Sequence, residues 1–119
     1  PNDVIIIADQ TLLTSAISNV LSNAVKYGPA QSIIKVTLST DKQNVTLTIS
    51  DCGDGVPEQA LTQLFTPFYR VNLARDRNTG GTGLGLAIAK QAINAHHGEI
   101  FAKNNANKGL SVIIQLPYL

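Results

Sequence analysis

Apolar residues gather in helix-forming runs in two segments of the chain. In residues 10–27 they fall on one stripe, which consists of Leu13, Ile17, Val20, Leu21 and Ala24. This spacing predicts an amphipathic helix. Asp9 precedes it as a suitable N-cap, and Gly28-Pro29 is typical of a helix end. Residues 84–95 predict a second helix because they form a continuous helix-forming apolar run.

Alternation of apolar and polar residues at period two predicts strands. Residues 33–39 and 45–50 predict a β-hairpin with one buried face, and residues 99–103 and 110–116 predict a closing pair of strands. A β-branched run at residues 4–8 predicts a short first strand. Residues 51–82 are rich in turn formers, with at most a short helix near residues 58–63. This order predicts an α+β fold, a two-layer sandwich whose mixed, mostly antiparallel sheet is covered on one face by helices.

Length and charge limit the possible functions. The chain has 119 residues, which predicts one domain over residues 1–119. Its formal net charge of +1 gives no global field for nucleic acid or for a membrane surface. Cys52 is the single cysteine, so no internal disulfide forms. The sequence contains no methionine, even at its first position, and we therefore expect it to be a segment of a longer protein.

A glycine-rich segment leads into the second predicted helix. Gly81, Gly83 and Gly85 alternate with other residues directly before the apolar run. Such a loop allows close approach of the backbone to a polyanion and directs a helix N-terminus at it. The spacing matches neither a Walker A loop nor the Rossmann fingerprint. A flexible linker is the alternative interpretation, and the abrupt entry into a packed helix argues against it.

Polar side chains occupy one strip of the first predicted helix. Asn19 and Asn23 lie four residues apart, and Lys26 and Tyr27 extend the strip away from the apolar stripe. Asparagine oxygens suit Mg²⁺, which takes its remaining ligands from phosphates and water, and a lysine can meet a phosphate as a point charge. Taken alone, such a pair of asparagines is more often a solvated helix surface.

A carboxylate follows the second predicted strand. Gly53 and Gly55 remove side-chain bulk around Asp51, which can then accept a hydrogen bond from the amine of adenine. The alternative is a tight Asx-type turn with no ligand at all.

An aromatic segment precedes the glycine-rich loop. Phe65 and Phe68 are apolar anchors, and Arg70 begins a polar, charge-rich stretch through residue 79. Anchors followed by a basic segment and a glycine hinge suit a lid that orders over a bound nucleotide. An ordinary surface loop is the alternative.

Four motifs resemble, in this order, the N, G1, F and G2 boxes of the sensor histidine kinases. They are residues 19–27 (NVLSNAVKY), 51–55 (DCGDG), 65–68 (FTPF) and 81–85 (GTGLG). The resemblance extends over residues 9–117 and implies the Bergerat ATP-binding fold. Within the family, residues 68–82 are similar to the envelope-stress-sensing kinases of Gram-negative bacteria.

The resemblance also implies roles for individual residues. Asn23 and Asn19 are expected at Mg²⁺ and the phosphates, and Asp51 at the adenine amine. Asn23, Lys26 and Arg70 are the expected catalytic residues. The expected nucleotide-binding residues are Asn19, Asn23, Lys26, Tyr27, Asp51, Gly53, Gly55, Val56, Phe68, Gly81, Thr82, Gly83, Leu84, Gly85 and Ser111.

The implied reaction is that of a protein-histidine kinase with ATP and Mg²⁺ as cofactors. Related ATPases activate water with a glutamate on the first helix, whereas residues 10–27 contain no acidic residue. Transfer of the γ-phosphate to an external group is therefore favoured over hydrolysis. The expected acceptor is a histidine on a separate dimerisation domain, because His96 and His97 match a structural turn of the family before Gly98.

Two alternatives share the same pocket. One is a serine kinase of the anti-sigma-factor type, and the other is a module that senses ATP without transferring phosphate. For the preferred interpretation we expect a homodimeric parent protein in the bacterial inner membrane. This domain would lie in the cytoplasm, contact neither the membrane nor nucleic acid, and act indirectly on a response regulator.

Overall fold

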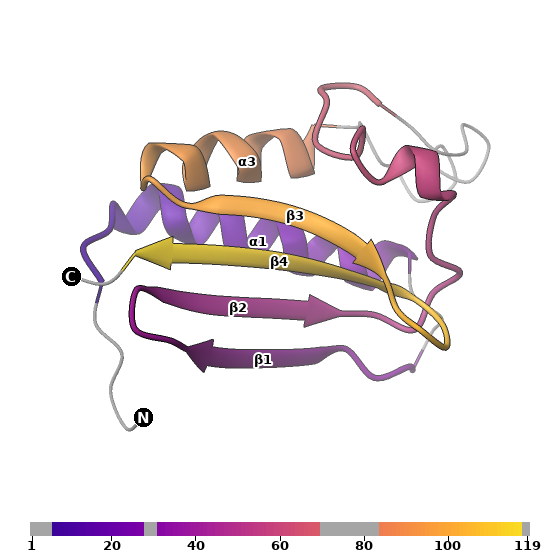
Figure 1. Cartoon of the computed structure of the whole chain (residues 1–119). Helices are drawn as coiled ribbons and strands as arrows, with labels where there is room; N and C mark the ends of the chain where they lie inside the picture. The colour runs from indigo at the N-terminus through magenta and orange to yellow at the C-terminus, as the bar shows by residue number, and fades with distance from the viewer. Residues whose placement is uncertain (1–5, 28–30, 70–83, 118–119) are drawn as a thin grey trace.

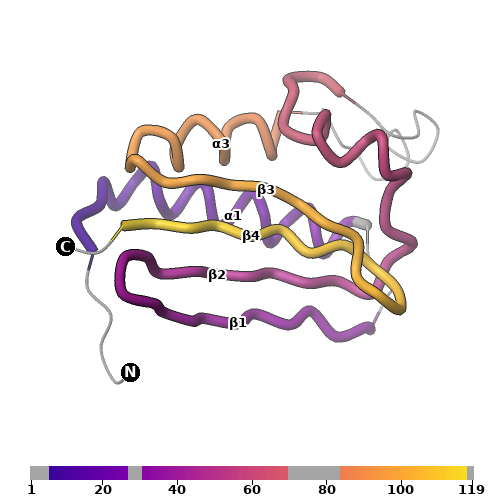
Figure 2. The backbone as a smooth tube through the Cα atoms, viewed as in Figure 1, coloured from indigo at the N-terminus to yellow at the C-terminus, as the bar shows by residue number. Residues whose placement is uncertain are grey.

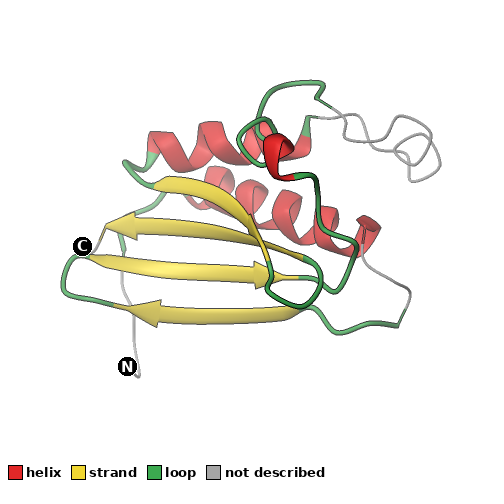
Figure 3. Ribbon diagram, turned by 45° about the vertical axis from the view of Figure 1, so that its right-hand side comes forward, coloured by secondary structure: helices red, strands yellow, loops and turns green. Residues whose placement is uncertain are grey.

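The computed structural model describes residues 6–27, 31–69 and 84–117. They form two layers, in which one sheet carries two helices on the same face (Figures 1 and 3). The helices are α1 (Gln10–Tyr27) and α3 (Gly85–Ala95), and a short 3-10 helix, η1 (Glu58–Ala60), lies between them in the sequence. The strands are β1 (Lys35–Thr40), β2 (Asn44–Ser50), β3 (Glu99–Asn104) and β4 (Leu110–Pro117). In these ranges no helix has the length and apolar character to cross a membrane.

The order of strands in the sheet is β1-β2-β4-β3, and all neighbouring pairs are antiparallel. The last residue of β2, Ser50, pairs with Ser111 near the beginning of β4. The chain therefore leaves β2 beside the turn that joins β3 to β4 (Figure 2). This topology brings the loop that starts at Asp51 to the same end of the sheet as the β3–β4 turn.

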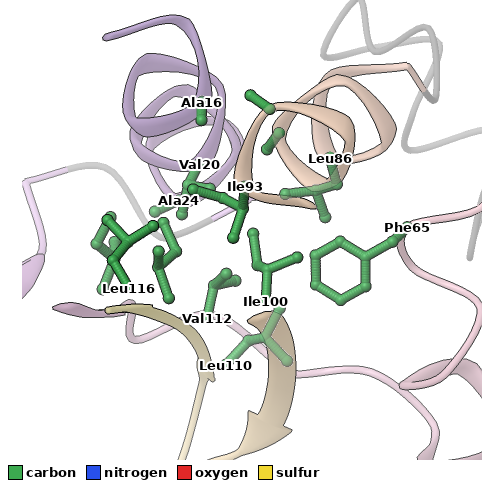
Figure 4. Close-up of a cluster of buried hydrophobic side chains, with 14 residues drawn as sticks. Ala16, Val20, Ala24, Phe65, Leu86, Ile93, Ile100, Leu110, Val112 and Leu116 are labelled. Atoms are coloured by element: carbon green, nitrogen blue, oxygen red, sulfur yellow. The ribbon is translucent and has the colours of Figure 1, made fainter. Parts of the chain in front are cut away.

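The core lies between the helices and the sheet (Figure 4). Ala16, Val20 and Ala24 of α1 recur every four residues and are all buried, so α1 presents small side chains to α3 and to the sheet. Ala16 was not part of the predicted stripe, whereas Leu13 and Leu21 are only partly buried against the core. The remaining buried members of the cluster are Ile49, Phe65, Leu86, Ala89, Ala92, Ile93, Ile100, Leu110, Val112, Ile114 and Leu116.

The predicted fold class is confirmed, and α1 has the predicted bounds. The expectation of at most a short helix near residues 58–63 is confirmed by η1. Two details of the prediction are wrong within the described residues. The sheet is antiparallel throughout instead of mixed, and residues 6–8 form no strand. The rest of the expected first strand, residues 4–5, lies outside the described residues, as does Gly28-Pro29.

The chain enters α1 through hydrogen bonds instead of strand pairing. The Asp9 N–H donates to Nε2 of His96 at 2.8 Å, and Asp9 Oδ1 accepts the Leu12 N–H at 3.0 Å, which confirms the predicted N-cap. His96 Nδ1 lies 2.7 Å from the Ala92 carbonyl oxygen in the last turn of α3. His96 therefore joins the start of α1 to the end of α3, in agreement with a structural turn.

Candidate nucleotide-binding site

Asp51 is fixed at the point where β2 ends. It is 6% exposed, and its Oδ1 accepts the N–H of Gly53 at 2.9 Å and of Leu110 at 3.1 Å. Its own N–H donates to the Leu110 carbonyl oxygen at 3.0 Å. The bond to Gly53 closes an Asx turn, which was the alternative interpretation of Asp51. This turn uses only Oδ1, so it is compatible with a ligand at the other oxygen. Among the described residues Oδ2 makes no hydrogen bond, and it is the oxygen that suits a ligand amine.

Two glycines allow the backbone to approach Asp51 and the loop that follows it. Gly109 has φ +98°, and a methyl group added there would overlap the Asp51 carbonyl oxygen. Gly55 has φ +74°, and its added carbon would lie 2.6 Å from Oδ1 of Asn104. Side chains are excluded at both positions by conformation and by space. A side chain at Gly55 would meet Asn104, so the expectation that Gly55 clears space around Asp51 stays a prediction. Gly109 is a contact with Asp51 that sequence reasoning missed.

Ser111 is a buried residue of β4 that pairs with the last residue of β2. Leu110 and Val112 on either side of it belong to the core cluster, so strand alternation places Ser111 on the opposite face of the sheet. Its hydroxyl oxygen is 2.6 Å from that of Ser50 and donates to Oδ1 of Asn105. Its expected place near the adenine carboxylate stays a prediction. Its hydrogen bonds connect Ser50 at the end of β2 to Asn105 in the β3–β4 turn.

The polar strip of α1 meets the start of α3. Asn19 and Asn23 are both half-buried, and Oδ1 of Asn19 would lie 3.5 Å from a methyl carbon added at Gly85. Asn19 Nδ2 donates to the Ser15 hydroxyl at 3.4 Å. The N-terminus of α3 thus begins beside Asn19, and the positive end of its dipole favours an anion there.

The α1 strip also fits the implied metal. The asparagine amides offer hard oxygen donors, and Mg²⁺ needs few of these because it takes most ligands from phosphates and water. Within the described ranges, no three histidine, cysteine, aspartate or glutamate side chains come together. Asn19 and Asn23 are the residues on this strip that could offer such oxygen donors to Mg²⁺, and Lys26 is exposed near the end of the same helix.

The remaining predicted residues differ in burial and in whether the structure describes them. Gly53 is buried, Val56 and Leu84 are half-buried, and Phe65 packs into the core beside Ile100 (Figure 4). Phe68 is 70% exposed, with φ +64°. Tyr27 ends α1, and nothing is described of its side chain. Outside the described residues lie Arg70, Gly81, Thr82 and Gly83.

Comparison with known proteins identifies the family of this chain. Residues 8–119 match the model of the family described as "Histidine kinase-, DNA gyrase B-, and HSP90-like ATPase". The chain belongs to this family of ATPase domains, and its resemblance to the histidine kinases is confirmed by the similarities that follow.

Curated relatives are sensor histidine kinases. The chain is 40% identical over 118 residues to the sensor histidine kinase WalK of Bacillus subtilis, covering 98% of this chain and 19% of WalK. It is 44% identical over 105 residues to the sensor histidine kinase CpxA of Escherichia coli, covering 88% of this chain and 22% of CpxA. The chain thus spans about a fifth of the length of either relative.

A solved structure supports the same fold. The mycobacterial sensor histidine kinase MprB superposes with a TM-score of 0.86 at 36% identity, over 95% of this chain and 76% of the MprB chain. The expected similarity to the envelope-stress-sensing subgroup stays a prediction.

Proposed function

We propose that the chain is the catalytic domain of a sensor histidine kinase, which binds Mg-ATP and presents its γ-phosphate to a histidine on a separate dimerisation domain. One observation carries this proposal. The buried Asp51 carboxylate and the asparagine strip of α1 belong to one domain of the histidine kinase-type ATPase family, and each has the chemistry for one end of ATP.

The base end is preorganised by the protein itself. Because Oδ1 of Asp51 is held by the N–H groups of Gly53 and Leu110, the carboxylate cannot rotate freely, and Oδ2 has a fixed direction. A fixed carboxylate accepts from the exocyclic amine of adenine and disfavours the carbonyl oxygen that guanine has at the same position. Gly53, Gly55 and Val56 would form the wall next to the base.

At the phosphate end, α1 and α3 contribute complementary groups. Asn19 and Asn23 would hold Mg²⁺, which when bound neutralises phosphate charge during transfer. Lys26 adds a positive charge, and the α3 N-terminus adds oriented N–H groups. Arg70 and the glycine segment at residues 81–83 are proposed to complete this end.

Transfer to a partner is favoured over hydrolysis because α1 has no acidic residue to activate water. In the transfer, a nitrogen of the acceptor histidine forms a bond to the γ-phosphorus while the bond from that phosphorus to the β,γ-bridging oxygen breaks, and ADP leaves. The domain contributes positioning and charge stabilisation. We further propose that the parent protein is a homodimer in the bacterial inner membrane, with this domain in the cytoplasm and a response regulator as the next phosphate acceptor.

The test mixes the purified chain with a separately purified histidine-bearing dimerisation domain and γ-labelled ATP. Label on the dimerisation domain that is lost in acid and stable in base supports the proposal, because phosphohistidine has this stability. Label on serine would instead support a kinase of the anti-sigma-factor type. ATP binding with no label on either residue would support a sensing module.

A further inference from the structure

Asn104, the last residue of β3, forms two hydrogen bonds with the main chain of Val56 through its side-chain amide. Its Nδ2 donates to the Val56 carbonyl oxygen at 2.7 Å, and its Oδ1 accepts the Val56 N–H at 3.0 Å. Such double pairing resembles what a neighbouring β-strand would provide to one residue. The loop that follows Asp51 is thus attached to the sheet by a side chain 48 positions away in sequence.

The same amide restricts the residue before Val56. A carbon added at Gly55 would lie 2.6 Å from Asn104 Oδ1, and the φ of Gly55 is +74°. Gly55 and Asn104 therefore fit each other as a pair. The conformation of the glycine brings Val56 within reach, and the amide then holds it there.

The next residue, Asn105, forms a hydrogen bond with the first residue of the same loop, Asp51. Asn105 Nδ2 lies 3.3 Å from the carbonyl oxygens of both Asp51 and Lys108. Two consecutive asparagines thus hold the first and the last residue of the segment from Asp51 to Val56. This segment includes the carboxylate and both glycines that are proposed to face the base.

We propose that Asn104 is a positioning residue for the adenine ring, which acts through Val56 and Gly55 without touching the nucleotide. The inference rests on the proposed function, because it assigns a role relative to the ring that Asp51 recognises. Small displacements of a binding wall weaken contacts that depend on geometry. Release of Val56 should therefore reduce affinity for the base and leave the contacts at the phosphate end in place.

The test compares Asn104→Ala with Asn107→Ala, which removes an exposed asparagine from the same turn. Affinities for ADP and for inosine diphosphate, which has an oxo group in place of the amine, are measured by calorimetry in Mg²⁺. For Asn104→Ala we expect ADP affinity to fall about tenfold, which is typical of the loss of two hydrogen bonds. The ratio of the affinity for ADP to that for inosine diphosphate should also become smaller. Asn107→Ala should leave both affinities unchanged.

Melting curves by circular dichroism accompany each measurement. If Asn104→Ala does not fold, Asn104→Asp replaces it, because this variant has the same shape and keeps the acceptor for Val56 N–H while losing the donor. Folded Asn104→Ala with ADP affinity within about twofold of the parent chain, or with equal losses for both nucleotides, would overturn the positioning role. A parent chain that binds neither nucleotide, or both equally, would instead overturn the proposed adenine site.

Discussion

The sheet has two hairpin turns, and they are held in opposite ways. The β1–β2 turn is closed by its own residues. Oδ1 of Asp41 accepts the N–H groups of Gln43 and Asn44, each at 2.7 Å, and the Asp41 N–H donates to the Asn44 carbonyl oxygen at 3.0 Å. The β3–β4 turn lies at the other end of the sheet and bonds to the loop that follows β2 (Figure 1).

The β1–β2 turn only connects two strands, whereas the β3–β4 turn also contacts the loop that begins at Asp51. The first needs a short polar residue that satisfies nearby N–H groups, and many sequences provide one. The second must accommodate the backbone of Asp51, which it does through Gly109 and Asn105. Substitutions in the two turns should consequently differ in both the size and the kind of their effects.

The largest effect is expected for Gly109→Ala. The added methyl group would overlap the Asp51 carbonyl oxygen at a φ of +98°. Because the Asp51 N–H is bonded to the carbonyl oxygen of the adjacent Leu110, a shift that relieves the overlap would disturb this pairing. We expect the free energy of unfolding to fall by about 4 kcal/mol or more, which lowers the melting temperature by roughly 15 °C or prevents folding. Circular dichroism measures this change.

Gly85→Ala is the matched control for stability. Its nearest contact would be 3.5 Å from Asn19 Oδ1, which is ordinary packing distance, at the first position of a helix. This variant should melt within a few degrees of the parent chain. A Gly109→Ala protein that melts at the same temperature as Gly85→Ala would show that the β3–β4 turn is as tolerant as an ordinary connection.

Asp51→Asn should affect binding much more than folding. The amide oxygen of asparagine still accepts the N–H groups of Gly53 and Leu110, so the local structure should persist. The negative charge toward the base is lost, and we expect ADP affinity to fall roughly ten- to a hundredfold. Calorimetry on a variant with an unchanged melting temperature tests this, and unchanged affinity would remove the assignment of Asp51 to adenine.

Asn23→Ala tests whether the phosphate end works independently of either turn. Asn23 lies on α1, where its oxygen is proposed to bind Mg²⁺, so its loss should weaken ADP binding about tenfold in Mg²⁺ and little in EDTA. Ser22→Ala changes an exposed neighbour on the same helix and should leave both affinities unaltered. Equal weakening with and without Mg²⁺ would contradict the metal role.

Features set by neighbouring residues could be predicted from the sequence. The bounds of α1 follow from its apolar period and its capping Asp9, and the place of Asp51 follows from the end of an alternating strand. A capping bond or an Asx turn joins residues a few positions apart, so the sequence pattern contains both partners.

Contacts between distant segments could not be found in this way. Asn104 and Asn105 are ordinary turn formers in the sequence, and their partners Val56 and Asp51 become neighbours only when β2 and β3 both pair with β4. The hydrogen bonds of Ser111 with Ser50 and Asn105 could not be predicted for a related reason. A motif assigns a residue to a site, but strand register decides which face of the sheet it occupies.

The smallest effect is expected at the β1–β2 turn and depends on pH. Hydrogen bonds from the backbone N–H groups of Gln43 and then Asn44 lower the pKa of Asp41 below its ordinary value, and the carboxylate is fully exposed. Its contribution to stability is therefore present above the ordinary pKa and is lost as the pH falls through the lowered pKa of the folded state.

Asp41→Asn keeps an acceptor for the turn without the charge. We expect it to melt slightly below the parent chain at neutral pH, with the difference vanishing in acid and ADP affinity unaltered, because this turn lies at the opposite end of the sheet from Asp51. A difference that persists at about pH 2, or a change in ADP affinity, would contradict the view that this turn serves only to close its hairpin.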